Sequence, residues 1–132
     1  MDTHRLIELA IQARKPELAP YSGFSVGAAL LTQTGHVYTG CNIESSSYGL
    51  TICAERVALF KALSEGETKF SAIAIVAPGS NGAPPCGACR QLLNDYAPNL
   101  FVHIASLNGE VNTETIKDLL PLAFDGGFLS DE

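Results

Sequence analysis

The chain has 132 residues, of which 46% are apolar and 17% charged, and its formal net charge is −6. This length fits a single domain spanning residues 1–132, and the apolar content excludes a disordered chain. The negative charge argues against nucleic acid and anionic membranes as partners, since both attract a basic protein face. The low charged fraction suggests that part of the surface packs against another subunit.

The N-terminal part of the chain predicts a helix followed by a β-hairpin. Residues 2–15 place apolar side chains on a wide helical face, with Thr3 as the expected N-cap. Two strand patterns follow, over residues 25–32 and 36–41, and we expect the turn between them at Thr34-Gly35.

The next segment predicts a polar connection and a second helix. Residues 42–52 are rich in serine and lie between regular elements, where binding residues are often held. Residues 53–63 are helical but apolar almost all round. Such a helix is covered on several sides, so we expect the sheet on one side and a second subunit on another.

The C-terminal half alternates strands with helices. Residues 71–77 are continuously apolar, which is typical of a strand buried on both faces. The expected elements that follow are a loop over 78–85, a helix over 86–96, a buried strand over 100–105, a turn at 108–109, a short strand over 110–112 and a helix over 113–120 capped by Thr113. The order α-β-β-α-β-α-β-β-α predicts a three-layer α/β domain.

Neither a membrane span nor a secretory signal is predicted. The longest apolar run, residues 72–77, is far shorter than the roughly 20 residues that cross a bilayer. Charged residues at positions 2, 5 and 8 interrupt the N-terminal region. We therefore expect a cytoplasmic protein, in which four cysteines are more typical of metal ligands or redox groups than of disulfides.

Three of the cysteines stand at the start of two predicted helices. Cys53 opens the second helix, while Cys86 and Cys89 lie one turn apart at the start of the third. A helix N-terminus favours the thiolate and lowers the pKa of a thiol. Together the three sulfurs would supply three ligands for Zn²⁺ and leave the fourth tetrahedral position open, as in catalytic zinc sites.

Other interpretations of the cysteines remain open. Cys86 and Cys89 alone could form a redox pair or half of a structural zinc site. A four-cysteine structural site would have to recruit Cys41, which ends a strand pattern and is better explained as a small buried apolar residue. A redox pair is expected after the first strand of a domain, whereas this pair comes late and leaves Cys53 unexplained.

Glu55 and Arg56 follow directly after the first of these cysteines. A first-turn acid could simply complement the helix dipole in solvent. Because Glu55 lies beside a predicted ligand on an apolar helix, we favour a general acid–base that moves a proton from water at the metal to a substrate atom. Three thiolates leave one net negative charge on a zinc site, and Arg56 and the helix N-termini can offset it.

Six short segments, spread over nearly the whole chain, complete the pattern. They are Ala19-Pro20-Tyr21-Ser22, Phe24-Ser25-Val26-Gly27-Ala28, Gly40-Cys41-Asn42-Ile43-Glu44, Cys53-Ala54-Glu55-Arg56, Pro85-Cys86-Gly87-Ala88-Cys89-Arg90-Gln91 and Leu119-Leu120-Pro121. The paired cysteine motifs are typical of zinc deaminases in general. With Asn42-x-Glu44 added, the sequence resembles the nucleoside deaminases, and in particular the small homotetrameric cytidine deaminases.

This resemblance implies a fold, a reaction and a role for each matching residue. The implied fold is a three-layer α/β/α sandwich with a mixed five-stranded sheet. The implied reaction converts cytidine or deoxycytidine to uridine or deoxyuridine with release of ammonia, a step of pyrimidine salvage. By this resemblance, the zinc ligands are Cys53, Cys86 and Cys89, the proton shuttle is Glu55, and Arg56 donates a hydrogen bond to the ligand sulfurs. The substrate would contact Phe24 through its pyrimidine and Asn42 and Glu44 through its ribose hydroxyls. Tyr48 and Phe124 would contribute to the site of a neighbouring subunit.

The substrate-binding residues also have plainer interpretations. Phe24 and Phe124 could be core residues, Asn42 could cap a turn and Glu44 could be solvated. An amide and a carboxylate together in a polar loop nevertheless suit a diol, because the carboxylate accepts from hydroxyls while the amide both donates and accepts.

Other functions also remain open at this point. An enzyme with these motifs could deaminate a related cytosine-bearing nucleoside, such as an antibiotic, although Asn42-x-Glu44 favours an ordinary ribose. A deaminase of RNA or DNA is disfavoured by the net charge of −6. A structural zinc or redox module is disfavoured by Glu55 and by the open fourth position.

The charge pattern also bears on the form of the substrate. No Lys or Arg occurs between Lys15 and Arg56, which favours a nucleoside over its 5′-phosphate.

Overall fold

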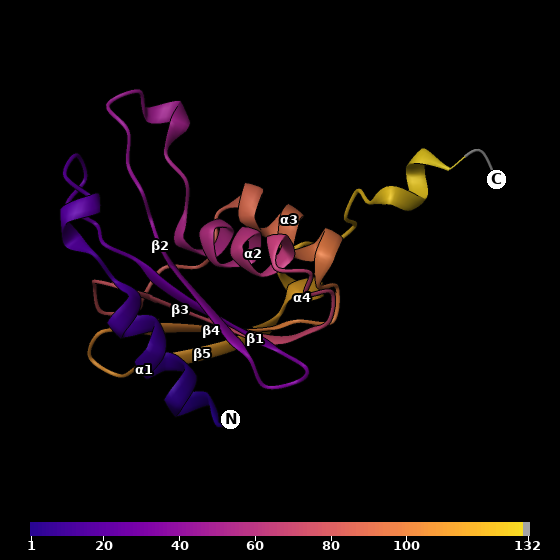
Figure 1. Ribbon diagram of the computed structural model, residues 1–132, viewed down its shortest axis with the longest axis horizontal. Helices are drawn as coiled ribbons and strands as arrows, with labels where there is room; N and C mark the ends of the chain where they lie inside the picture. The colour runs from indigo at the N-terminus through magenta and orange to yellow at the C-terminus, as the bar shows by residue number, and fades with distance from the viewer. Residues whose placement is uncertain (131–132) are drawn as a thin grey trace.

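The computed structural model describes residues 1–130 and centres on a five-stranded sheet with strand order β2-β1-β3-β4-β5 (Figure 1). The strands are β1 (Gly27–Thr32), β2 (Val37–Cys41), β3 (Phe70–Ala77), β4 (Phe101–Ser106) and β5 (Val111–Thr115). β3 and β4 run parallel, whereas the other neighbouring pairs are antiparallel. The sheet is therefore mixed, as the resemblance implied.

Helices cover both faces of this sheet. Helix α1 (Thr3–Ala13) lies on one face, and α2 (Ala54–Ser64), α3 (Gly87–Tyr96) and α4 (Ile116–Leu119) lie on the other (Figure 1). The predicted three-layer α/β/α arrangement is confirmed. The predicted hairpin is also confirmed, with Gly35 in its turn at a φ of +96°.

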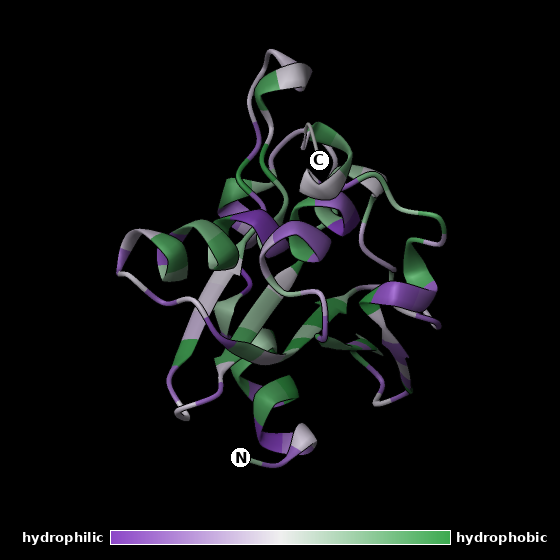
Figure 2. Ribbon diagram, turned by 90° about the vertical axis from the view of Figure 1, so that its right-hand side faces the viewer, coloured by the Kyte–Doolittle hydropathy of each residue, from purple (hydrophilic) through white to green (hydrophobic). Residues whose placement is uncertain are grey.

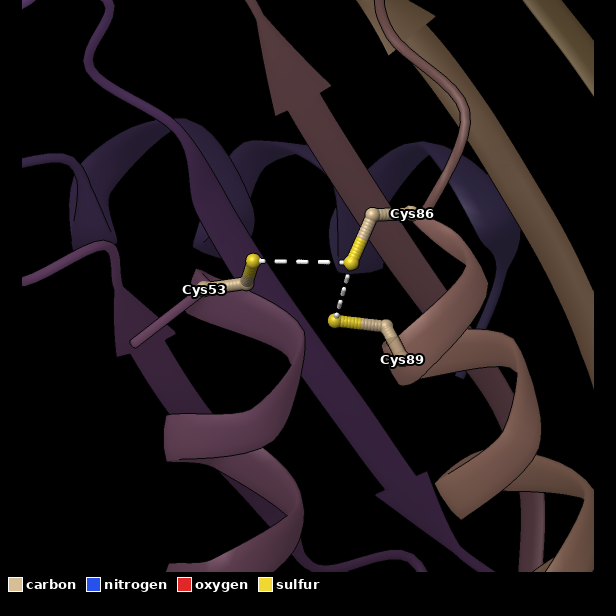
Figure 3. Close-up of side chains that lie close together, drawn as sticks. All are labelled: Cys53, Cys86 and Cys89. Atoms are coloured by element: carbon tan, nitrogen blue, oxygen red, sulfur yellow. Dashed lines mark hydrogen bonds between the residues drawn. The ribbon is translucent and has the colours of Figure 1, made fainter. Parts of the chain in front are cut away.

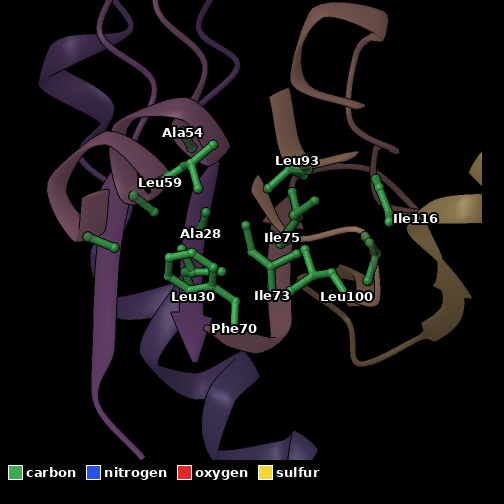
Figure 4. Close-up of a cluster of buried hydrophobic side chains, with 14 of the residues drawn as sticks. Ala28, Leu30, Ala54, Leu59, Phe70, Ile73, Ile75, Leu93, Leu100 and Ile116 are labelled. Carbon is green, nitrogen blue, oxygen red and sulfur yellow. The ribbon is translucent and has the colours of Figure 1, made fainter. Parts of the chain in front are cut away.

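The central strands alternate their side chains between two cores of different character. On the side of α2 and α3 they present large side chains, among them Leu30, Ile73 and Ile75 (Figure 4). Val102 and Ile104 belong to the same cluster. On the side of α1 they present mostly alanine, namely Ala29, Ala72, Ala74 and Ala105. Small side chains on that face let α1 pack closely against the sheet, and a Cβ at Gly27 would lie 1.9 Å from the Ala10 carbonyl oxygen.

The predicted N-cap of the first helix is wrong by one residue. Asp2, and not Thr3, caps α1: its Oδ1 accepts a hydrogen bond from the Arg5 N–H at 2.8 Å. Both residue types cap helices well, so local preference did not separate them.

The last predicted helix is wrong in its start and its cap. Strand β5 continues to Thr115, which pairs with Phe101 at the start of β4. Helix α4 therefore begins at Ile116, and Thr115 rather than Thr113 caps it. Thr113 stays in β5, where its hydroxyl hydrogen-bonds to Nδ1 of His103 at 2.8 Å. Strand pairing has overridden a helix start that the sequence favoured locally.

Two segments extend away from the sheet and its helices. The connection between β2 and α2 projects from the body and carries a short 3₁₀ helix, Tyr48–Leu50 (Figure 1 and Figure 2). After α4 the chain leads outward to a second short 3₁₀ helix, Gly126–Leu129 (Figure 1). Through residue 130, the structure contains no helix with the length and apolar character that a bilayer crossing requires.

Gly40 allows α2 to lie directly against β2. A Cβ at this position would come within 2.5 Å of the Ala54 carbonyl oxygen and 2.7 Å of the Ala58 nitrogen. Because α2 begins at Ala54, directly after Cys53, this contact also sets where the N-terminus of α2 lies.

Replacing Gly40 with alanine should lower the free energy of unfolding by about 1–3 kcal/mol, because the added methyl group overlaps the backbone of α2. Urea denaturation of the purified proteins measures this difference. Gly49→Ala is a matched control, since a Cβ there meets nothing within 4 Å, and we expect it to change stability by less than about 0.5 kcal/mol. An equal loss in both variants would contradict the packing argument.

Candidate active site

Two helix N-termini bring the three predicted metal ligands together. Cys53 is the N-cap residue of α2, Cys86 is the N-cap residue of α3, and Cys89 follows in the first turn of α3. The Sγ atoms of Cys53 and Cys86 are 3.7 Å apart, and those of Cys86 and Cys89 are 3.5 Å apart (Figure 3). All three sulfurs lie within 4.8 Å of one another, and residues 1–130 contain no second cluster of this kind.

The spacing of these sulfurs fits a tetrahedral metal ion. With Zn–S bonds of about 2.3 Å, two ligands of a regular tetrahedron lie about 3.8 Å apart. The two sulfur–sulfur distances are close to that value. The remaining cysteine, Cys41, is buried at the end of β2 and does not belong to the group, as predicted. The cluster thus offers three protein ligands in total, the number found in catalytic sites, whereas structural sites have four.

Arg56 supplies positive charge to this cluster. Its Nη2 donates a hydrogen bond to Cys53 Sγ at 3.4 Å. A hydrogen bond from Cys89, together with the one from Arg56, lowers the pKa of Cys53 to about 5. The contact with Cys53 in turn raises the pKa of Cys89. A bound cation would favour the thiolate form of all three ligands.

Glu55 is a buried acid next to the cluster. It lies in the first turn of α2 and is only 5% exposed. Burial raises the pKa of Glu55 to about 7, and the nearby negative charge of Cys53 acts in the same direction. A carboxyl group whose pKa lies near neutrality can both accept and donate a proton. The solvated surface acid that the sequence left open is therefore excluded.

A cleft of about 270 Å³ opens beside the cysteines. Its lining residues are Ser22, Phe24, Val26, Asn42, Glu44, Thr51, Cys53, Ala54, Glu55, Ile75, Ala83, Pro84 and Cys86. The cleft thus brings the predicted residues Phe24, Asn42 and Glu44 together with the metal cluster and Glu55. Its lining contains two carboxylates and neither lysine nor arginine.

Asn42 holds one wall of this cleft. Its Oδ1 accepts a hydrogen bond from the Val26 N–H, and its Nδ2 donates to the Phe24 carbonyl, both at 2.9 Å. The residue is 8% exposed, so these bonds are shielded from water. Each end of the amide has one further hydrogen-bonding position. Asn42 can therefore support the Phe24 backbone and still bind a ligand, a double role that the sequence did not indicate.

Glu44 is held by two residues to which sequence reasoning assigned no role. Its Oε1 accepts hydrogen bonds from the backbone N–H groups of Tyr21 (2.9 Å) and Ser22 (3.1 Å). Its Oε2 accepts from the Ser22 hydroxyl. This hydroxyl contact is the main reason that the pKa of Glu44 is lowered, so Glu44 is a carboxylate at neutral pH. The only sequence signal for Tyr21 and Ser22 was their place in a matching motif.

Tyr48 and Phe124 do not line this cleft. Tyr48 is 76% exposed on the projecting connection, and its ring lies edge-on to Tyr21 with the centroids 6.3 Å apart. Phe124 lies in the outward C-terminal segment, is 56% exposed and stacks on Phe128. A core role for Phe124 is therefore excluded, and the expectation that both residues serve a neighbouring subunit's site stays a prediction.

An α/β/α fold with three converging thiols and a buried acid beside them is typical of zinc-dependent enzymes. The chain matches the family model described as "Cytidine and deoxycytidylate deaminase zinc-binding region" over residues 1–104. This match covers well over half of the chain, so the protein belongs to the cytidine and deoxycytidylate deaminase family.

Individual relatives match over nearly the full length. A cytidine deaminase from Halalkalibacterium halodurans is 50% identical over 132 residues, covering 99% of this chain and 100% of its own. One from Sporosarcina psychrophila is 45% identical over 131 residues, covering 98% and 96%. The crystal structure of a cytidine deaminase from Burkholderia pseudomallei matches with a TM-score of 0.89 and 48% identity, covering 94% of this chain and 100% of that one.

Two cysteine variants test the composition of the metal cluster. Cys89→Ala should lose the bound metal, because it leaves two thiols and no third ligand in the cluster. Cys41→Ala, an equal truncation of another buried cysteine, should keep it. The metal content of the purified proteins, measured by plasma mass spectrometry, decides between them. Loss of metal from the Cys41 variant would indicate a structural site with four thiolates.

Proposed function

We propose that this protein is a zinc-dependent cytidine deaminase, which converts cytidine and deoxycytidine to uridine and deoxyuridine and releases ammonia in pyrimidine salvage. The observation that carries the proposal is the buried carboxyl of Glu55 beside three convergent thiols in one cleft. Relatives with this name match nearly the whole chain, so an antibiotic deaminase or a structural zinc or redox module is not favoured. We further propose that residues 1–132 act as one catalytic domain in the cytoplasm.

The cluster and its neighbours divide the chemistry between them. Cys53, Cys86 and Cys89 would hold one Zn²⁺ per chain, which when bound acts as a Lewis acid that makes water more acidic. Glu55 takes protons from the attacking water and delivers one to the ring nitrogen N3 and one to the departing amino group. Oxygen thereby replaces nitrogen at C4, and ammonia leaves. Arg56 lowers the negative charge that three thiolates would otherwise concentrate at the metal.

The cleft residues Phe24, Asn42 and Glu44 would bind the nucleoside. Phe24 offers an aromatic ring, 41% exposed, against which the pyrimidine can pack. The carboxylate of Glu44 and the amide of Asn42 can bind the ribose hydroxyls. Because Glu44 and Glu55 line the cleft without a lysine or arginine, a 5′-phosphate would meet repulsion and no basic partner. The proposed substrate is therefore the nucleoside itself.

A comparison of Glu55 variants tests this proposal. The protein should deaminate cytidine, which is followed by the change in ultraviolet absorbance. Glu55→Gln should keep its metal but lose about 10²–10⁴-fold or more in kcat, because the other carboxylate of the cleft lining, Glu44, is held by Tyr21 and Ser22 and does not replace it as the proton carrier. Glu17→Gln removes an exposed carboxylate outside the cleft and should leave kcat unchanged. Substantial turnover by Glu55→Gln would contradict the proposal.

The same assay separates the nucleoside from its phosphate. Cytidine 5′-monophosphate should show a much lower kcat/KM than cytidine at equal pH and salt. Comparable values for the two substrates would mean that a basic residue reaches the cleft from outside its present lining.

We also propose a homotetramer whose subunits share active sites, through Tyr48 and Phe124. Exposed apolar side chains on both outward segments support this proposal: Tyr48 and Leu50 on one, and Leu122, Phe124, Phe128 and Leu129 on the other. On α2, Phe60 is 43% exposed and offers a further apolar side chain for contact with a second subunit.

Phe124→Ala tests the shared site. It should raise KM for cytidine while costing clearly less than the about 3–5 kcal/mol of a buried phenylalanine, because Phe124 is exposed within its own chain. Kinetics and urea denaturation measure the two effects, and light scattering measures the assembly. A stable, active monomer would contradict both the tetramer and the shared site.

A further inference from the structure

The part of the cleft that carries Phe24, Asn42 and Glu44 is built from two segments that are far apart in the sequence. The loop before β1 and the segment after β2 are joined by backbone hydrogen bonds from Glu44 to Leu18 (3.0 Å) and from Asn42 to Val26 (3.4 Å). Side chains add the bonds of Asn42 and Glu44 described above. The position of each proposed substrate-binding group therefore depends on how these segments are connected.

The hydroxyl of Ser22 connects two of those groups at once. It accepts a hydrogen bond from the Phe24 N–H at 2.9 Å and donates its own proton to Oε2 of Glu44. Ser22 is thus the one side chain among the lining residues that contacts both the backbone of the proposed base-stacking residue and the proposed ribose-binding carboxylate.

A count of acceptor sites shows what this contact leaves for a ligand. A carboxylate has about four positions that accept hydrogen bonds, two on each oxygen. On Glu44, two backbone N–H groups occupy Oε1, and the Ser22 hydroxyl occupies one position on Oε2. One position on Oε2 remains. Without the hydroxyl, only Oε1 would be held, and the carboxylate could turn about that end.

We propose that Ser22 is a positioning residue for substrate binding, whose hydroxyl orients Glu44 toward the sugar diol. This inference rests on the proposed function, since it takes Glu44 as the group that binds ribose. The side-chain hydrogen bonds of Ser22 go to Glu44 and Phe24 and not to the cysteines or Glu55, so its removal should weaken binding without slowing the chemical step. Phe24 also keeps its bond from Asn42, so the effect should fall mainly on Glu44.

Two substrates separate this role from a structural one. Ser22→Ala should raise KM for cytidine about 10-fold, the effect of one hydrogen bond to a charged group, and change kcat by less than about twofold. For 2′,3′-dideoxycytidine, which lacks the 2′- and 3′-hydroxyls of the sugar, the same variant should leave KM close to the wild-type value. Ser22→Thr keeps the hydroxyl at an exposed position and should restore KM for cytidine.

Two further variants complete the test. Adding Ser22→Ala to Glu44→Gln should raise KM for cytidine little more than Glu44→Gln alone, because the serine acts through the carboxylate. Ser46→Ala removes an exposed hydroxyl from the connection between β2 and α2, outside the cleft lining, and should leave both substrates unaffected.

The outcomes are distinct. An equal rise in KM for cytidine and dideoxycytidine, a fall in kcat, or full additivity with Glu44→Gln would overturn the positioning role and leave the deaminase proposal intact. A wild-type protein that does not deaminate cytidine at all would instead refute the proposed function, and the role of Ser22 with it.

Discussion

The site depends on one electrostatic constraint: three thiol groups must stay together although their ionised forms repel one another. Two helix N-termini and the guanidinium of Arg56 supply the compensating positive charge. Both N-termini lie at the same end of the sheet because α2 leads into β3 and α3 leaves it, and each helix packs on the same face. The parallel pair of β3 and β4 requires a crossover, which α3 supplies, and α2 precedes β3 on the same face; together these two connections place Cys53 beside Cys86.

Close packing holds those helices at the distance the sulfurs require. Because Gly40 has no side chain, the backbone of α2 packs directly against β2. Large aliphatic side chains fill the space between the sheet and helices α2 and α3. The other face carries alanines and accepts a single helix, α1. The larger side chains therefore lie on the face of the sheet that α2 and α3 cover, and these are the helices that carry the site. The same packing also buries Glu55, and burial is what raises its pKa toward neutrality.

Two residues of the proposed substrate site also stabilise the loop beside it. Asn42 and Glu44, which are proposed to bind the sugar, already use part of their hydrogen-bonding capacity to hold the loop that carries Phe24. A ligand would therefore meet groups whose orientation is set before it arrives, which reduces the entropy lost on binding. The same arrangement explains why residues with no reactive group, such as Ser22, matter for the geometry of the wall.

The sequence by itself determined the three-layer class and most of the elements, because these follow from periodicity. Spacing within single helices also singled out Cys53 with Glu55 and Cys86 with Cys89, whereas the meeting of the two helix N-termini is a property of the fold. Tertiary structure decided what local spacing does not encode. Pairing with β4 extended β5 to Thr115 and displaced the expected cap at Thr113. The contact of Ser22 with Glu44 joins residues 22 positions apart, and it exists because two segments pair at the end of the sheet. Tyr48 and Phe124 lie outside their own chain's cleft, because the connection and the C-terminal segment that carry them lead away from the sheet.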